Sequence, residues 1–209
     1  MSEDKDKDNI NDVFKYETQW KDLFENKRFI SEFCSDVLEN YITKQRWYGG
    51  KASAIKYIDI LNYFKIENDN DLFYGVILEV NFKEAFVQEY FLPIGLVKEK
   101  DYVDYQIISR LDLNGERSYL VDATLLESFR AQIFNKIAEG DKYKYEIVEY
   151  RRGRKCSDHS YESSRFLSGE QSNTSIVFND KYILKFFRRV YTDQNPDYEI
   201  SKFLTNNGY

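Results

Sequence analysis

The stretch from Ser168 to Lys202 reads SGEQSNTSIVFNDKYILKFFRRVYTDQNPDYEISK, and it is the clearest indication of the fold expected for the second half of the chain. It opens with small and hydroxyl-bearing residues, up to Ser175, that let the backbone approach an anion and offer N–H groups to it. The strand formers at 176–178 follow, and Asn179-Asp180 is a turn signal before a second strand-like run. The stretch therefore predicts a polar loop and then a β-hairpin.

A strand with a lysine and a helix with a glutamate complete this segment. Lys185 lies in the return strand, and Asn195-Pro196 has the pattern of a helix N-cap followed by proline at the first helical position. Apolar residues then recur at helical spacing around Glu199. The two charges either serve a nucleotide-phosphate site, as the strand lysine and helix glutamate of kinases do, or lie on an ordinary surface. Because the loop lacks G-x-G-x-x-G, the pattern alone favours the surface interpretation.

Motifs in three parts of the chain carry a resemblance to a known family. The first comprises GEQSNTSIVF, ILKFFRRV and NPDYEISKFLT, close together and in this order; the second is YITKQRWYGGK, from Tyr41 to Lys51; the third is DATLLESFRAQIF, from Asp122 to Phe134. Together they resemble bacterial maltokinases, including those fused to trehalose synthase. The second motif is similar to the Q-R-W-(F/Y)-x-G-(K/R) opening of the N-terminal cap of that family, and the third resembles the helix between cap and hairpin.

The resemblance implies an activity and a nucleotide site. Maltokinases transfer the γ-phosphoryl group of ATP, with Mg²⁺, to the anomeric hydroxyl of maltose. Their fold resembles the aminoglycoside-phosphotransferase and eukaryotic-kinase architecture, with an added cap. Carried over by position, Ser172, Asn173, Thr174 and Ser175 form the phosphate-covering loop, Lys185 contacts the ATP phosphates, and Glu199 pairs with Lys185.

The catalytic aspartate, the metal ligands and most of the maltose site of that family belong to a C-terminal lobe with no counterpart in this sequence. We therefore expect the N-terminal part of a maltokinase, inactive alone and without catalytic or metal-binding residues of its own. Its partners would be the C-lobe, in cis or as a separate chain, together with maltose, ATP and trehalose synthase. The alternative is a stand-alone, non-catalytic cap module that binds a protein partner or a glucan.

The remaining pattern predicts an α+β fold, with an antiparallel-sheet cap and helices followed by part of a kinase-like N-lobe. Apolar residues at helical spacing cover 19–41, with an interruption near Asn26, and three strand-like runs over 55–97 predict an antiparallel meander. Further strands are expected at 105–109 and 118–121. A helix is expected from Thr124 to Glu139, with Thr124 and Glu127 at capping-box spacing and Gly140 past its end.

The expected organisation is a disordered tail at 1–14, a cap domain at 15–105 and a kinase-like segment at 106–209. The hydrophobic content of 42% excludes wholesale disorder, and the net charge of −6 argues against nucleic-acid or anionic-membrane binding. No apolar run is long enough to span a membrane, so a cytoplasmic protein is expected. Cys34 and Cys156 are expected to be free thiols, and the single histidine, His159, does not suggest a metal site.

Two clusters of basic and aromatic residues leave alternatives open. The segment from Gln45 to Lys51 is either a sugar- or phosphate-binding loop or, as we favour, a structural anchor in which Trp47 is buried. Arg188 and Arg189 either help to neutralise phosphate or are solvated at the surface.

Overall fold

The computed structural model describes residues 13–103, 106–140, 148–153, 156–157, 160–167, 173–191 and 193–207. Ser172, His159 and most of the expected tail lie outside these residues, although Val13 and Phe14 belong to a strand. The elements are, in order, β1 (Val13–Tyr16), η2 (Trp20–Glu25), α1 (Lys27–Glu32), the π-helical η3 (Phe33–Val37), α2 (Leu38–Ile42), β2 (Ile55–Glu67), β3 (Leu72–Phe82), β4 (Val87–Lys98), η4 (Glu99–Asp101), β5 (Ile107–Leu113), β6 (Glu116–Asp122), η5 (Ala123–Leu125), α3 (Glu127–Glu139), β7 (Ser164–Phe166), β8 (Asn173–Phe178), β9 (Tyr182–Phe187), β10 (Arg189–Val190) and α4 (Pro196–Asn206).

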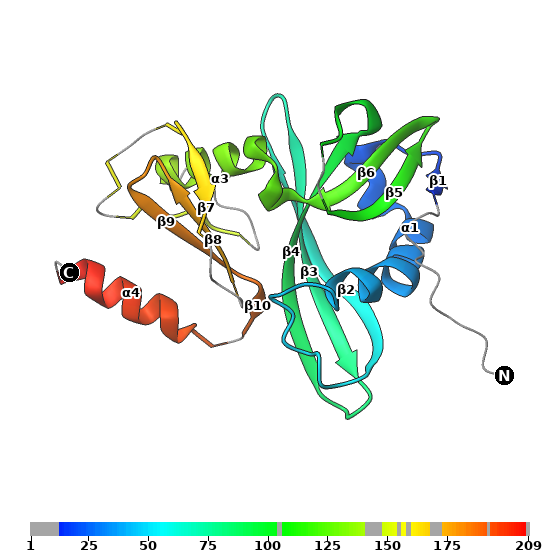
Figure 1. Ribbon diagram of the computed structural model, residues 1–209, viewed down its shortest axis with the longest axis horizontal. Coiled ribbons are helices and arrows are strands. Elements are labelled where there is room, and N and C mark those ends of the chain that lie inside the picture. The colour runs from blue at the N-terminus through cyan, green and yellow to red at the C-terminus, as the bar shows by residue number, and fades with distance from the viewer. Residues whose placement is uncertain are drawn as a thin grey trace.

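A large, curled and mostly antiparallel sheet is the centre of the fold, which confirms the α+β class (Figure 1). Its strand order is β1-β5-β6-β4-β3-β2, with β10 added beside β4 and β1 parallel to β5. The predicted meander is confirmed, because β2, β3 and β4 pair antiparallel in sequence order. Strands from both sides of residue 105 share this sheet, since β4 pairs with β6.

Strand β4 changes partners along its length, and this opens the sheet at one end. Its first part pairs with β3 from Asn81↔Val87 to Tyr74↔Ile94, whereas its last part, Ile94 to Lys98, pairs with β6 on the other edge. The start of β3 therefore diverges from the end of β4. The Trp20 indole Nε1 donates a hydrogen bond of 2.9 Å to the Leu72 carbonyl at this opening.

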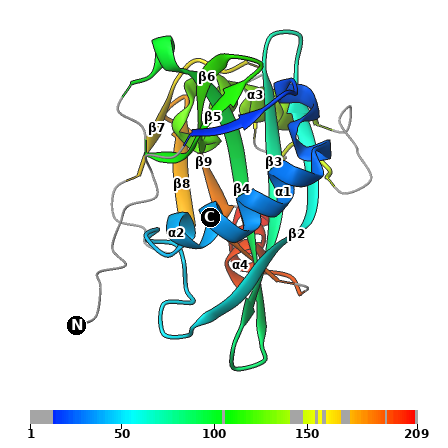
Figure 2. The ribbon, with the colours of Figure 1, turned by 90° about the vertical axis from the view of Figure 1, so that its right-hand side faces the viewer.

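The spacing at 19–41 predicted a helical segment, and the structure shows it packed on one face of the sheet (Figure 2). It is interrupted at Asn26, whose side chain accepts hydrogen bonds from the backbone N–H groups of Arg28 and Phe29 and so caps α1. Phe24, Phe29 and Phe33 are buried beneath the segment with ring centroids 5.1–6.3 Å apart. A buried aromatic cluster thus fixes the helices to the sheet.

Strand β2 alternates between a buried and an exposed face only over its first residues. Ile58 is buried, whereas Tyr57 and Leu61 on the opposite face are 45% and 53% exposed. A register shift between Ile60 and Asn62 then breaks the period of two that would place both on one face. Further along the strand the face that was exposed at Tyr57 becomes covered, because Phe64 packs against the hydrophobic cluster that includes Phe129 of α3.

Helix α3 lies between the large sheet and a small one, and different residues of the helix pack against each sheet. Phe129 and Ile133 pack against the large sheet, and Phe134 and Ala138 pack against Ile176 and Phe178 of the small sheet. The expected capping box is wrong, because α3 begins at Glu127 with Leu126 as its N-cap, while the Thr124 hydroxyl is bonded to Asp122 instead. Gly140 ends the helix with φ of 68°, as predicted.

The small sheet has the strand order β7-β8-β9 and is antiparallel throughout (Figure 1, left). The predicted hairpin turn is confirmed, since Asn179 and Asp180 have φ of 50° and 52°, the left-handed values that a tight hairpin turn requires. The predicted start of the last helix is confirmed as well. The Asn195 side chain accepts a 2.9 Å hydrogen bond from the Asp197 N–H, and Pro196 is the first residue of α4.

Candidate functional site at the hairpin and the Arg188 pocket

The hairpin brings together several residues expected to form a phosphate site. Ser175 of β8 and Lys185 of β9 are direct partners across the strand pair, so their side chains share one face of the small sheet. Asn173 lies two residues before Ser175 and therefore belongs to the same face. Ser175 is buried, and the Lys185 side chain is 36% exposed. This face presents two small polar side chains and one ammonium group.

Helix α4 contributes a carboxylate to the same face. Lys185 Nζ lies 3.8 Å from Asp197 Oδ2, in the first turn of α4. The expected partner, Glu199, is an exposed residue of the same turn. Sequence reasoning missed Asp197, although its place directly after Pro196 was a signal. Acidic side chains are favoured in the first turn of a helix because they complement the unpaired N–H groups there.

Thr174 projects from the opposite face of β8, where it contacts a buried arginine. Its Oγ1 accepts a 3.0 Å hydrogen bond from Arg188 Nε. Arg188 is 1% exposed, so the solvated-surface interpretation is wrong for this residue. Its Nη2 lies 2.8 Å from Asp122 Oδ2 and also donates to Thr124 Oγ1 at 3.1 Å. Arg188 is therefore a buried and paired charge.

Asp122 is held in place by the η5 turn, so the ion pair has a rigid anchor. The second carboxylate oxygen, Oδ1, accepts hydrogen bonds from the Thr124 N–H at 2.9 Å and from the Thr124 hydroxyl at 2.6 Å. The Arg188 carbonyl in turn accepts a 2.7 Å bond from the Phe91 N–H of β4. These contacts tie the large sheet to strand β8 of the small one.

The Gln45-Arg46-Trp47 motif lies against this network. Trp47 is buried, as the structural interpretation expects, and its ring centroid is 5.4 Å from Arg188 Cζ. Gln45 Nε2 donates a 3.1 Å bond to the Tyr41 carbonyl, which fixes the turn after α2. Burial and, secondarily, the Asp122 charge raise the pKa of Tyr41 well above its ordinary value, so its hydroxyl stays neutral.

A pocket of about 510 Å³ joins the two sequence motifs. Its lining includes Gln45, Arg46 and Trp47 of the first motif, residues 173–175 of β8, and the Arg188–Asp122 pair. The volume falls within the usual range for small-molecule sites. Residues 45–47 thus line a pocket although Trp47 is also a buried structural anchor. The sequence presents a binding loop and a structural anchor as alternatives, whereas the structure allows both roles.

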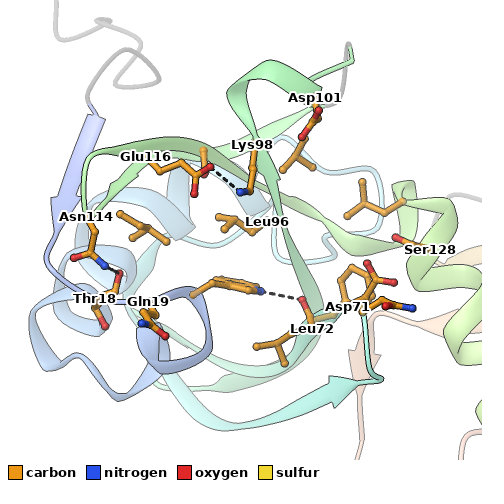
Figure 3. A pocket seen from close by; sticks show the side chains of 17 residues that line it. Thr18, Gln19, Asp71, Leu72, Leu96, Lys98, Asp101, Asn114, Glu116 and Ser128 are labelled. Atoms are coloured by element: carbon orange, nitrogen blue, oxygen red, sulfur yellow. Dashed lines mark hydrogen bonds and ion pairs between the residues drawn. The ribbon is translucent and has the colours of Figure 1, made fainter.

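A second hollow, of about 660 Å³, lies at the opening between β3 and β4 (Figure 3). The Trp20 indole lines it together with polar side chains that include Asp71. Lys98 Nζ and Glu116 Oε1 are 2.7 Å apart on one side, and Asn114 Nδ2 donates a 3.0 Å bond to the Thr18 carbonyl on another (Figure 3).

A scan against models of protein families finds no match for this chain. Over the described ranges, no group of three or more histidine, cysteine, aspartate and glutamate side chains is placed to hold a metal ion. The helices in the same part of the chain include none long and apolar enough to cross a membrane.

Proposed function

We propose that this chain supplies the cap and the phosphate-binding hairpin of an ATP-dependent sugar kinase of the maltokinase type. The observation that carries the proposal is the placement of Lys185 opposite Ser175, within ion-pair distance of the first turn of α4. A strand lysine held by a carboxylate of the following helix is how kinase-like enzymes fix a cation against nucleotide phosphates. We take maltose as the phosphoryl acceptor because the three motifs resemble those of maltokinases.

In this proposal the chain contributes positioning and charge and leaves the chemical step to a second lobe. Lys185 would neutralise phosphate oxygens, and Asn173 and Ser175 would border the same site. The described residues offer no set of Mg²⁺ ligands, so the metal and the general base would be held by the second lobe, in cis or in trans. Ile200 and Phe203 of α4, 58% and 64% exposed, offer an apolar surface on which that lobe can pack.

Replacing the lysine tests the proposal in the enzyme joined to its second lobe. Lys185→Met keeps the aliphatic stem but removes the ammonium group, so maltose-dependent ATP turnover should fall by about 10²-fold or more. Lys181→Met, in the turn of the same hairpin, is the control and should retain activity. This chain without the second lobe should show no maltose-dependent ATP consumption. Unchanged turnover in Lys185→Met would contradict the nucleotide-site assignment.

The same assay identifies the carboxylate that holds the lysine. Asp197→Asn should raise the KM for ATP more than Glu199→Gln if the observed ion pair persists when nucleotide binds. The reverse order would show that α4 rotates to bring Glu199 to Lys185. Either result leaves a helix carboxylate in the role, whereas no effect of either change would remove that part of the proposal.

A second candidate function, carbohydrate binding by the cap itself, is favoured by the hollow in Figure 3. Its indole is fixed by the bond from Trp20 Nε1 to the Leu72 carbonyl, and a flat aromatic surface beside carboxylate and amide groups suits a pyranose ring. A maltooligosaccharide titrated into the chain should bind, and Asp71→Ala should weaken binding. Lys83→Ala, an exposed change outside the hollow, is the control. Equal binding by both variants, or none by the parent chain, would exclude this function.

A further inference from the structure

Arg188 has a hydrogen-bonding group that its protein neighbours do not satisfy. Among the residues that the structure describes, Nη1 is buried without a partner, although Nε and Nη2 are bonded to Thr174, Thr124 and Asp122. A buried donor without an acceptor destabilises the fold, because it has lost its hydrogen bond to water and gained none in return. Arg188 lines the 510 Å³ pocket, so an acceptor that binds there and displaces the atoms covering Nη1 would complete its hydrogen bonding.

The charges around the pocket indicate what kind of acceptor fits. The charged residues that line the pocket are Lys44, Arg46, Arg188 and the carboxylate Asp122. Asp122 already accepts from Arg188 and Thr124 through both oxygens. Arg188 is paired with Asp122, and Arg46 adds a further positive charge at the pocket, which suits the negative charge on a phosphate monoester at neutral pH.

A hydroxyl donor is available as well. Thr174 Oγ1 accepts the Nε proton of Arg188, which leaves its own proton to donate to an oxygen in the pocket. Guanidinium groups match the geometry of phosphate oxygens and bind them by charge-assisted hydrogen bonds. We propose that the pocket between the Gln45-Arg46-Trp47 motif and strand β8 binds a small phosphorylated ligand, whose phosphate group is held by Arg188, Arg46 and Thr174.

This site shares residues 173–175 of β8 with the proposed nucleotide site, but it is built on Arg188 rather than Lys185 and does not depend on that assignment. Lys185 and Glu199 are not among the lining residues of the pocket, and Thr174 projects from the face of β8 opposite to Lys185. The ligand would contact the turn after α2 and the start of β8 at once. Its binding would therefore stabilise the small sheet against the large one.

Phosphate-dependent stability is the direct test on the 209-residue chain. Inorganic phosphate should raise the thermal unfolding midpoint relative to chloride at equal ionic strength, and titration calorimetry should give a saturable isotherm. Glucose 6-phosphate and glucose distinguish the source of the phosphate. Tighter binding of glucose 6-phosphate than of phosphate supports a phosphorylated metabolite, and equal binding supports recognition of the phosphate group alone. No saturable binding of either anion would overturn the proposal.

Variants at the rim locate the site without disturbing the core. Lys44 and Arg46 are both exposed, so Lys44→Gln/Arg46→Gln should leave the fold intact while weakening phosphate binding by about tenfold or more. Lys21→Gln/Lys27→Gln makes the same change of net charge at exposed positions elsewhere and should leave phosphate affinity unchanged. Arg188→Lys, which retains the charge but loses the guanidinium fork, should also weaken binding. Equal affinity in the rim variant and its charge control would overturn the assignment.

Discussion

At the scale of single residues, Arg188 and Asp122 form the most consequential pair in the described structure. Their side chains are 2% and 7% exposed, and breaking one side of such a pair leaves an uncompensated buried charge. We expect Asp122→Asn to lower the free energy of unfolding by about 3–5 kcal/mol, measured by urea denaturation. Asp180→Asn is the matched control, because its ion pair with Arg165 is exposed and should change stability by about 1 kcal/mol or less. Similar losses in both variants would contradict the buried-pair argument.

Cys34 provides a residue-scale test of the packing between the N-terminal helices and the sheet. Burial and, secondarily, the Asp59 charge raise the pKa of its thiol to about 11, so the reactive thiolate forms only in alkaline solution. In a Cys156→Ser background, the Cys34 thiol should react with a disulfide reagent far more slowly at about pH 8 in the native state than in urea. The rate should rise as the pH approaches the raised pKa. Equal rates in the native and unfolded states would show that Cys34 is accessible and its pKa ordinary.

At the scale of elements, a stack of aromatic rings joins three strands on the α3 side of the sheet. Phe64 of β2, Phe91 of β4 and Phe186 of β9 are nearly parallel, with neighbouring centroids 6.1 and 6.4 Å apart. The Phe64 ring also lies over Gly75 of β3, where a Cβ atom would overlap it. The glycine thus lets the ring approach the backbone closely, so β2, β3, β4 and β9 are mutually dependent.

Gly75→Ala tests this arrangement. The added methyl group should displace the Phe64 ring and lower stability by about 1–3 kcal/mol in a denaturation experiment. The loss should shrink in a Phe64→Leu background, because the smaller side chain leaves room. Gly153→Ala is the control, since nothing lies within 4 Å of an added Cβ there. A full loss in the Phe64→Leu background would mean that the ring is not the obstacle.

At the scale of the whole molecule, stability is distributed unevenly between the large sheet and the last helix. No residue of α4 is buried, whereas Tyr74, Val76 and Leu78 of β3 are fully enclosed. Helices of this length are marginal in water without packing. Hydrogen exchange of the chain alone should therefore be fast throughout α4 and slow in β3 and β4. Protection of α4 equal to that of β3 would contradict this picture. If α4 becomes protected when the second lobe is joined, the proposed packing of that lobe on the apolar face of α4 is supported.

Local sequence patterns predicted the features that depend on only a few neighbouring residues. The left-handed turn at Asn179-Asp180, the cap and proline that start α4, the end of α3 at Gly140 and the β2–β4 meander all follow from local patterns. Each depends on the backbone conformations and hydrogen bonds that a short segment can adopt alone. The face of the hairpin that carries Asn173, Ser175 and Lys185 follows from the same logic, since alternation along a strand is local.

Contacts between residues that are distant in the sequence could not be predicted from local patterns and depend on the packing of the whole chain. Arg188 bonds to Thr124, 64 positions earlier, and removal from water makes their interaction strong, although nothing near Arg188 in the sequence distinguishes it from Arg189. The same network overrode a local signal, because Asp122 holds the Thr124 hydroxyl that the capping-box pattern had assigned to α3. The pocket beside Trp47 and the opening of the sheet at Trp20 likewise arise where separate elements pack together. Burial and long-range pairing set these energies, and neither is a property of a local stretch of chain.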